Sequence, residues 1–270
     1  MPFLTKIALI LPQNEVKMMK KTVFIVFLGI VGLSAIFAQA FPVDDSNGDF
    51  YAKENNSDIK QEDAVNVNHI NSTYFTMPDV FEMKSNENLT ILSHYPTFQQ
   101  TTEYSCGPAA ALTVLEYYGK KSATEEELIK KMGASFETGT SVKGIANYFR
   151  NLGWNVKTNL DGWQPLEDYE PFAAFVQEKL KSGHPIMVEN VFMGGHWRVI
   201  IGYDTMGTKE TADDVLIFAD TYDTADHNQD GYGIENGENF FWSWFDHQIL
   251  PEDERKQPFV LAYPKEKMGN

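Results

Sequence analysis

Residues 106–118 are the stretch that most constrains the fold, because they predict a helix with apolar side chains on nearly every side. Pro108 suits the first turn of a helix, and the run from Ala109 to Tyr118 offers almost no polar face. Such a helix has to be covered by the rest of a domain. Cys106, the only cysteine of the chain, lies where this helix begins. The amide dipoles of the helix point at its sulfur and favour the thiolate, which is the nucleophilic form.

The segments that follow predict further helices and then a run of strands. A capping-box pattern at 124–127 opens a second helix, and Ser141 caps a third one. The apolar residues of the third helix recur at helical spacing and are expected to pack on the core: Ile145, Phe149 and Leu152. The other expected elements are a helix over 172–181, a strand and turn at 91–98, strands at 154–156, 185–188, 197–203, 215–220 and 259–263, and an aromatic segment of undecided type at 240–245. Helices first and sheet second predict one α+β domain.

The first 40 residues have the three-part pattern of a secretory signal peptide. A cluster of lysines precedes an apolar run of 16 residues, 23–38, which ends in Ala38-Gln39-Ala40. We expect cleavage after Ala40 and export of the mature chain. The alternative is an uncleaved membrane anchor, for which the apolar run falls just short of a comfortable span. Met18 or Met19 is a more natural start for such a peptide, which would place residues 1–17 upstream of the true start.

The composition of the mature chain argues against nucleic acid as a partner. The full chain has a net charge of −16, and removal of residues 1–40 leaves 18 basic and 37 acidic residues, a net charge of −19. Residues 41–90 are polar and acidic without helical or strand periodicity, which predicts a disordered spacer. We expect the folded domain at 91–264 and a short tail at 265–270. A single cysteine cannot form an internal disulfide, so Cys106 is free, capped or bridged to another molecule.

A cysteine nucleophile needs a base within hydrogen-bond reach and a third group that orients the base. Of six histidines, His196 has the most informative surroundings, because Gly194-Gly195 allows a close backbone approach before it and a buried strand follows it. Asp220 ends the next apolar strand, where its carboxylate can accept the other imidazole N–H. The alternatives are a structural histidine that caps its strand and an aspartate that only forms a turn.

Gln100, six residues before a Cys-Gly pair that opens a helix, resembles the pattern of the papain-like cysteine peptidases. The similarity is to the bacteriocin-processing (double-glycine) peptidases and their stand-alone relatives, and it spans residues 93–264. It implies a papain-like fold, in which an N-terminal helical part carries the nucleophile helix against a C-terminal antiparallel sheet. It also implies that Cys106 is the nucleophile, His196 the base and Asp220 the orienting acid. Relatives often follow this acid with proline, whereas here Thr221 follows it.

The same resemblance implies that the side-chain amide of Gln100 donates a hydrogen bond to the oxyanion formed during the reaction. The backbone N–H of Cys106 would be the second donor. Gln99 is the alternative donor, and a third interpretation makes both glutamines surface turn residues. The expected function is an exported, monomeric cysteine peptidase that acts on a peptide or protein and needs no cofactor. An acyl transferase with the same three residues and a non-catalytic peptide-binding relative are the alternative functions.

Residues 226–231 resemble the first half of a calcium-binding loop. Asp226, Asn228 and Asp230 supply oxygens at positions 1, 3 and 5, and Gly231 is the turn glycine at position 6. Position 12 is Gly237 and not the expected glutamate, so an Asp/Asn-rich turn is the alternative interpretation. Zinc is not expected, because one cysteine and scattered histidines offer no paired ligand spacing.

Overall fold

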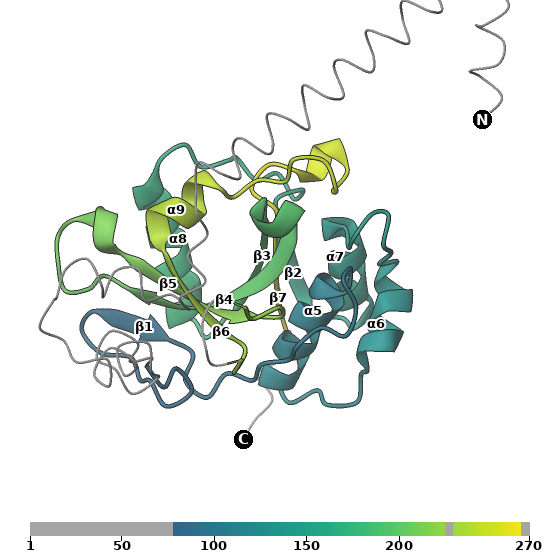
Figure 1. Cartoon of the computed structure of the whole chain (residues 1–270), viewed down its shortest axis with the longest axis horizontal. Helices are drawn as coiled ribbons and strands as arrows, with labels where there is room; N and C mark the ends of the chain where they lie inside the picture. The colour runs from purple at the N-terminus through teal and green to yellow at the C-terminus, as the bar shows by residue number, and fades with distance from the viewer. Residues whose placement is uncertain (1–77, 225–228, 266–270) are drawn as a thin grey trace, which may run out of the picture. The chain divides into compact units, whose positions relative to one another are not determined.

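In the part of the chain that the structure describes, residues 78–224 and 229–265, seven antiparallel strands form one sheet (Figure 1). These residues of the computed structural model belong to the unit Met77–Asn270. The strands are β1 (Leu89–Ile91), β2 (Asn155–Thr158), β3 (Ile186–Asn190), β4 (His196–Asp204), β5 (Val215–Asp220), β6 (Tyr232–Asn236) and β7 (Phe259–Tyr263). They are ordered β2-β7-β3-β4-β5-β6, and β1 pairs with the second half of β4 beside the start of β3. Strand β4 is therefore the central strand.

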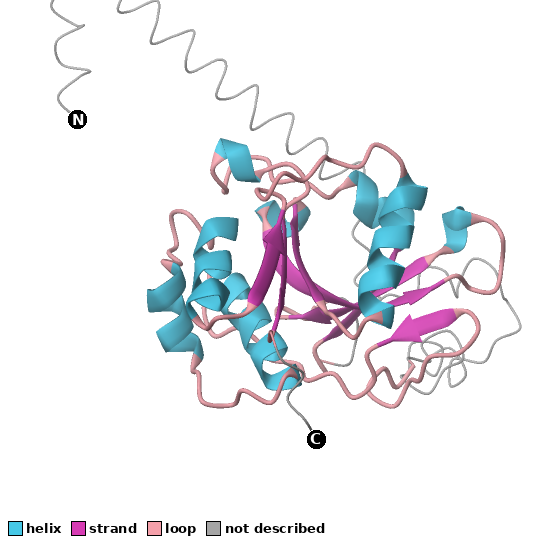
Figure 2. Cartoon of the chain, turned by 180° about the vertical axis from the view of Figure 1, so that it is seen from behind, coloured by secondary structure: helices cyan, strands magenta, loops and turns pink. Residues whose placement is uncertain are grey.

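Helices cover both faces of this sheet (Figures 1 and 2). Helices α5 (Cys106–Tyr117), α6 (Glu125–Met132) and α7 (Val142–Asn151) gather on one side, and α8 (Tyr169–Lys181) lies on the other side with α9 (Gly237–Trp242). Short 3₁₀ turns lie at Phe192–Gly194, Thr211–Asp213 and Glu252–Glu254. None of the helices in the described ranges is both long and apolar enough to span a membrane. The predicted α+β fold, with the cysteine helix on an antiparallel sheet, is confirmed.

Helix α5 is buried because its middle is built from small side chains. Ala109, Ala110 and Ala111 have no exposed surface, and Val114 is equally buried. Small residues let the helix lie close to β4 and to its neighbours α6 and α7. The expected caps of those neighbours are present: the hydroxyl of Thr124 accepts a hydrogen bond from the N–H of Glu127, and Ser141 does the same for the N–H of Gly144.

Leu152 does not pack on the core as the helical spacing predicted. Its side chain is 46% exposed, whereas Phe149, one turn earlier, has no exposed surface. The reason is that α7 ends at Asn151 and the left-handed Gly153 (φ 78°) reverses the chain directly afterwards. Trp154 is thereby turned inward, and the centroids of its ring and the ring of Phe149 are 5.1 Å apart. Trp154, and not Leu152, is therefore the residue that packs on the core after α7.

The folded part also begins earlier than the expected boundary at residue 91. Val80 is buried in the core, and β1 begins at Leu89. Both residues were assigned to the predicted spacer because the segment around them lacks a periodic pattern. The rest of that spacer, up to residue 77, and the predicted signal peptide lie outside the described residues. Strand β6 and helix α9 were not predicted, and α9 includes part of the aromatic segment of undecided type.

Candidate active site

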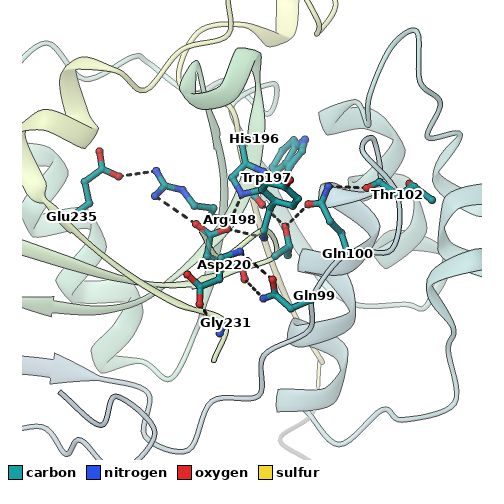
Figure 3. A network of polar contacts seen from close by, with 12 residues as sticks. Gln99, Gln100, Thr102, His196, Trp197, Arg198, Asp220, Gly231 and Glu235 are labelled. Atoms are coloured by element: carbon teal, nitrogen blue, oxygen red, sulfur yellow. Dashed lines mark hydrogen bonds and ion pairs between the residues drawn. The ribbon is translucent and has the colours of Figure 1, made fainter. Parts of the chain in front are cut away.

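The pairing of β4 with β5 brings His196 and Asp220 together. His196 is the first residue of β4 and Asp220 the last of β5, and the antiparallel register places Arg198 opposite Asp220. His196 Nε2 lies 2.7 Å from Asp220 Oδ1 (Figure 3). Both side chains are about 5% exposed. The two residues that the sequence analysis placed at neighbouring strand ends therefore form a direct, buried hydrogen bond.

Asp220 is held in its ionised form by several groups around it. The backbone N–H of Tyr222 donates to Oδ1 at 2.9 Å, and Arg198 Nη1 lies 4.0 Å from Oδ2. Arg198 is itself fixed by a 2.8 Å hydrogen bond to Glu235 and lies over the ring of Phe218, 4.1 Å from its centroid. Burial opposes ionisation, but the hydrogen bond with His196 and the nearby positive charges hold the pKa of Asp220 below its usual value.

His196 is set up to carry a positive charge at neutral pH. Burial lowers its pKa, but the hydrogen bond to Asp220 and the interaction with Cys106 outweigh that effect and raise the pKa to about 9. Because Nε2 is used by Asp220, Nδ1 is the ring nitrogen left to face the sulfur. A pKa raised above the unfolded value means that His196 contributes stability most fully below pH ~6.5 and loses that contribution as the pH rises through about 9.

Cys106 lies at the first position of α5 and is 7% exposed. No acidic residue stands in the first turn of this helix, and Ser105 at its N-cap makes no side-chain hydrogen bond to it. The positive end of the helix is thus left to act on the sulfur. Gly107 is required by packing, since a Cβ there would lie 2.6 Å from the Cβ of Thr140, whose carbonyl accepts a hydrogen bond from Trp197. The Cys-Gly pair lets the segment before α7 approach the start of α5.

The two glutamines make different contacts. Gln99 is exposed, and its side chain bridges the loop after β5, with Nε2 donating to the carbonyl of Asp220 and Oε1 accepting from the N–H of Asp223. Gln100 is half-buried; its Nε2 donates to the carbonyl of Thr102 at 2.8 Å, and its Oε1 lies 3.1 Å from the hydroxyl of Thr221. That hydroxyl is also 3.2 Å from the carbonyl of Trp197. In each glutamine one N–H of the side-chain amide is bonded to a backbone carbonyl and the second N–H is left to donate, so the count of N–H groups does not separate Gln100 from Gln99.

Thr221, which departs from the proline common in relatives, has a role in this arrangement. It is fully buried, its hydroxyl holds the oxygen of Gln100, and its carbonyl accepts the backbone N–H of Gln100. Proline has no hydroxyl, so the threonine adds a fixed point for the glutamine side chain. The departure thus ties the segment before the nucleophile to the end of β5.

The sequence analysis missed two buried acidic residues, one of which interacts with Cys106. Glu189 on β3 is 1% exposed and Asp246, in the segment after α9, is 4% exposed. Cys106 contributes to the raised pKa of Glu189, which places the two groups within electrostatic range. The strand was predicted to end at Val188, the residue before Glu189, whereas β3 continues to Asn190. A glutamate that continues an apolar strand was the one available sign that this carboxyl is buried.

The remaining histidines lie in other surroundings. His94 and His247 are exposed, and His184 stacks on Tyr263 with ring centroids 4.0 Å apart. His69 and His227 lie outside the described residues. Of the expected calcium ligands, Asp226 and Asn228 also lie outside them, and Asp230 Oδ1 accepts a hydrogen bond from the N–H of Tyr232. Calcium binding stays a prediction. Within residues 78–224 and 229–265 no group of three or more histidine, cysteine or acidic side chains is arranged to hold a metal ion.

Replacement of Asp220 by asparagine tests the electrostatic basis of this site. In Asp220→Asn the side-chain oxygen can still accept from Nε2, but the charge is gone, so we expect the pKa of His196 to fall from about 9 toward its ordinary value near 6.5. NMR titration of the imidazole measures this. Asp253→Asn, which removes an exposed carboxylate paired with Lys143, is the matched control and should leave the titration unchanged. An unshifted His196 in Asp220→Asn would contradict the assignment.

Comparison with known proteins identifies the family of this chain. A family model described as the Peptidase_C39 like family matches residues 92–249. No curated protein sequence matches the chain. Similar solved structures include the peptidase domain of Streptococcus ComA, described as a bi-functional ABC transporter involved in a quorum sensing pathway. That domain is 17% identical, with 64% of this chain and 100% of that chain covered and a TM-score of 0.41.

Two further solved structures are similar to this chain at comparably low sequence identity. One is a double glycine motif protease from an AMS/PCAT transporter in complex with the leader peptide (19% identity, 63% of this chain and 91% of that chain, TM-score 0.41). The other is a C39-like peptidase from Bacillus anthracis (15% identity, 67% and 100%, TM-score 0.46). The matched residues 92–249 make up more than half of the sequence. The chain therefore belongs to the Peptidase_C39-like family, which confirms the resemblance to bacteriocin-processing peptidases.

Proposed function

We propose that this protein is an exported cysteine peptidase that hydrolyses peptide bonds with Cys106 as nucleophile, His196 as acid and base, and Asp220 as the orienting group. Membership of the Peptidase_C39-like family supports a cysteine-peptidase type of function. The observation that carries the assignment of roles is the buried 2.7 Å hydrogen bond between His196 Nε2 and Asp220 Oδ1, beside a cysteine at a helix start.

The reaction begins from an imidazolium–thiolate pair. A pKa of about 9 keeps His196 protonated at neutral pH. In the proposed reaction this imidazole holds the proton, and the sulfur of Cys106 at the start of α5 acts as the nucleophile. The thiolate attacks the carbonyl carbon of the scissile peptide bond, and the carbonyl electron pair moves onto oxygen. Nδ1–H of His196 then protonates the leaving amine as the C–N bond breaks, which leaves a thioester. Neutral His196 takes a proton from water, the hydroxide attacks the thioester, and the released thiolate regains its imidazolium partner.

The oxyanion of both tetrahedral intermediates requires fixed donors. The backbone N–H of Cys106 is one, because it lies at the start of α5 where no earlier turn can accept it. The second is the side-chain amide of Gln100, fixed by Thr102 on the nitrogen and by Thr221 on the oxygen. Side chains and water supply every proton and electron pair in this sequence, so the proposed reaction does not call for a cofactor.

Loss of the nucleophile should abolish hydrolysis. We expect Cys106→Ala to lower kcat/KM for peptide substrates by far more than the ~100-fold typical of one lost oxyanion donor. Digestion of a peptide library by the purified protein, with products identified by mass spectrometry, measures this and also defines the cleavage site. Addition of an amine acceptor separates hydrolysis from acyl transfer, since a transferase would form the conjugate in preference to the free acid. Retention of activity in Cys106→Ala would exclude the mechanism.

The glutamine assignment has its own test. Gln100→Ala should reduce kcat by about 100-fold with a smaller change in KM, because an oxyanion donor acts mainly in the transition state. Gln99→Ala is the matched control and should have a much smaller effect on kcat. The reverse order of the two effects would assign the donor to Gln99.

The export part of the proposal concerns residues 1–40. Their three-part pattern supports removal of the segment after Ala40 during secretion. N-terminal sequencing of the protein recovered from outside the cell should begin at Phe41. Recovery of the full-length chain in the membrane fraction would favour the uncleaved anchor instead.

A further inference from the structure

Glu189 and Asp246 form a buried pair of acids beside the catalytic cysteine. Three of their oxygens, both of Glu189 and Oδ2 of Asp246, are buried without a hydrogen-bond donor among the described residues. As two carboxylates they could only accept hydrogen bonds, and burial of two such charges side by side is costly. A single proton shared between them reduces both costs, because one carboxyl group then donates to the other and only one of the two charges remains.

The surroundings place this proton on Glu189. Oδ1 of Asp246 accepts a 2.9 Å hydrogen bond from the N–H of Leu250 and lies 3.6 Å from Nε of Arg255, so the charged form of Asp246 is partnered. Glu189 has no comparable partner. Burial, the charge of Asp246 and the charge of Cys106 together raise the pKa of Glu189 to about 9. Glu189 is accordingly neutral at the pH where the imidazolium–thiolate pair forms.

The pair also lies against the turn that leads into His196. Gly195 has a φ of 125°, which favours glycine, and a Cβ at this position would lie 3.0 Å from Glu189 Oε1 and 3.2 Å from Asp246 Oδ2. In the β3–β4 register Glu189 is opposite Trp197, the residue after His196. The shape of the acid pair thus limits where the first residue of β4 can lie.

We propose that Glu189 is a positioning residue of the peptidase reaction, which in its neutral form shares a proton with Asp246, supports the turn at Gly195 and keeps a second negative charge away from the sulfur of Cys106. This inference rests on the proposed function. Its consequence is that two separate proton losses end activity at high pH. One is the loss of the imidazolium proton of His196, and the other is the loss of the proton between the two acids, which would place a carboxylate beside the thiolate and the developing oxyanion.

Among the described residues, three groups influence the proton shared by Glu189 and Asp246. Asp246 faces Glu189 from the segment after α9, Cys106 lies across from it on α5, and Arg255 acts through Asp246. We therefore expect log(kcat/KM) of the parent protein to fall with a slope of about two above pH ~9, since both His196 and Glu189 titrate there.

Three variants test the proposal. Glu189→Ala removes the donor and the support of the turn, so kcat at neutral pH should fall about tenfold with KM little changed. Glu189→Gln can donate an N–H to Asp246 but cannot ionise; it should restore most of that loss and reduce the alkaline slope to about one. In Asp246→Asn the new amide can donate to Glu189 and stabilise its ionised form, so activity should begin to fall at a lower pH than in the parent.

Asp214→Asn is the matched control, because Asp214 is also a buried carboxyl with a raised pKa but hydrogen-bonds Tyr203 instead. It should leave the slope at about two. A slope of two retained in Glu189→Gln, or an alkaline limb unmoved in Asp246→Asn, would overturn the proposal. The pH profile of Cys106 alkylation and the thermal unfolding of each variant show whether the site is intact. Hydrolysis that survives in Cys106→Ala would instead overturn the proposed function.

Discussion

The register between β4 and β5 is the constraint on which the site depends. It brings the start of one strand to the end of the other, so that a histidine and an aspartate 24 residues apart meet at 2.7 Å. A shift of one residue would turn every side chain of β4 to the opposite face of the sheet. The register is protected by burial on both faces, since the side chains from His196 to Tyr203 are all buried. The same residues that stabilise the core therefore also fix the geometry of the acid–base pair.

Burial makes the electrostatics of this site strong, and the chain offsets the cost locally. Arg198 is an example, since its guanidinium lies between Asp220 and Glu235 and over the ring of Phe218. It partners two carboxylates at once, and the aromatic face covers the rest of it. With these contacts Asp220 can stay ionised in the interior and accept a hydrogen bond from Nε2–H of the imidazole ring. The orienting acid of the proposed triad thus needs its own support, which comes from β4, β5 and β6.

The sequence was sufficient where a function depends on neighbours along the chain. Cys106 could be placed at a helix start because Pro108 and the alanines after it determine that helix, and His196 could be chosen because its glycines and its strand adjoin it. Contacts across strands were not accessible in this way. Arg198 is a single charged residue within an apolar stretch of sequence, and the register with β5 is what places it opposite Asp220.

Other differences arose where tertiary packing decides between equal local patterns. Leu152 continues a helical repeat, but the turn at Gly153 brings Trp154 inward in its place. Strand β6 has little alternation and begins with the buried Tyr232 between Gly231 and Gly233, and its pairing with β5 gives it an extended form. Gln99 and Gln100 have the same side chain and are adjacent, so the sequence separates them only by their distance from Cys106, whereas the fold gives them different hydrogen-bond partners.

Asp220 and Glu189 are both buried carboxyl groups near Cys106, and their surroundings favour opposite protonation states. Asp220 is surrounded by His196, Arg198 and a backbone N–H, all of which favour its anion. Glu189 faces another acid and the sulfur, and both favour its neutral form. In the proposed mechanism the carboxylate of Asp220 holds the imidazolium, and a negative charge on Glu189 would oppose the thiolate. The separation of the two pKa values, one lowered and one raised to about 9, is therefore what allows both acids to lie within one buried site.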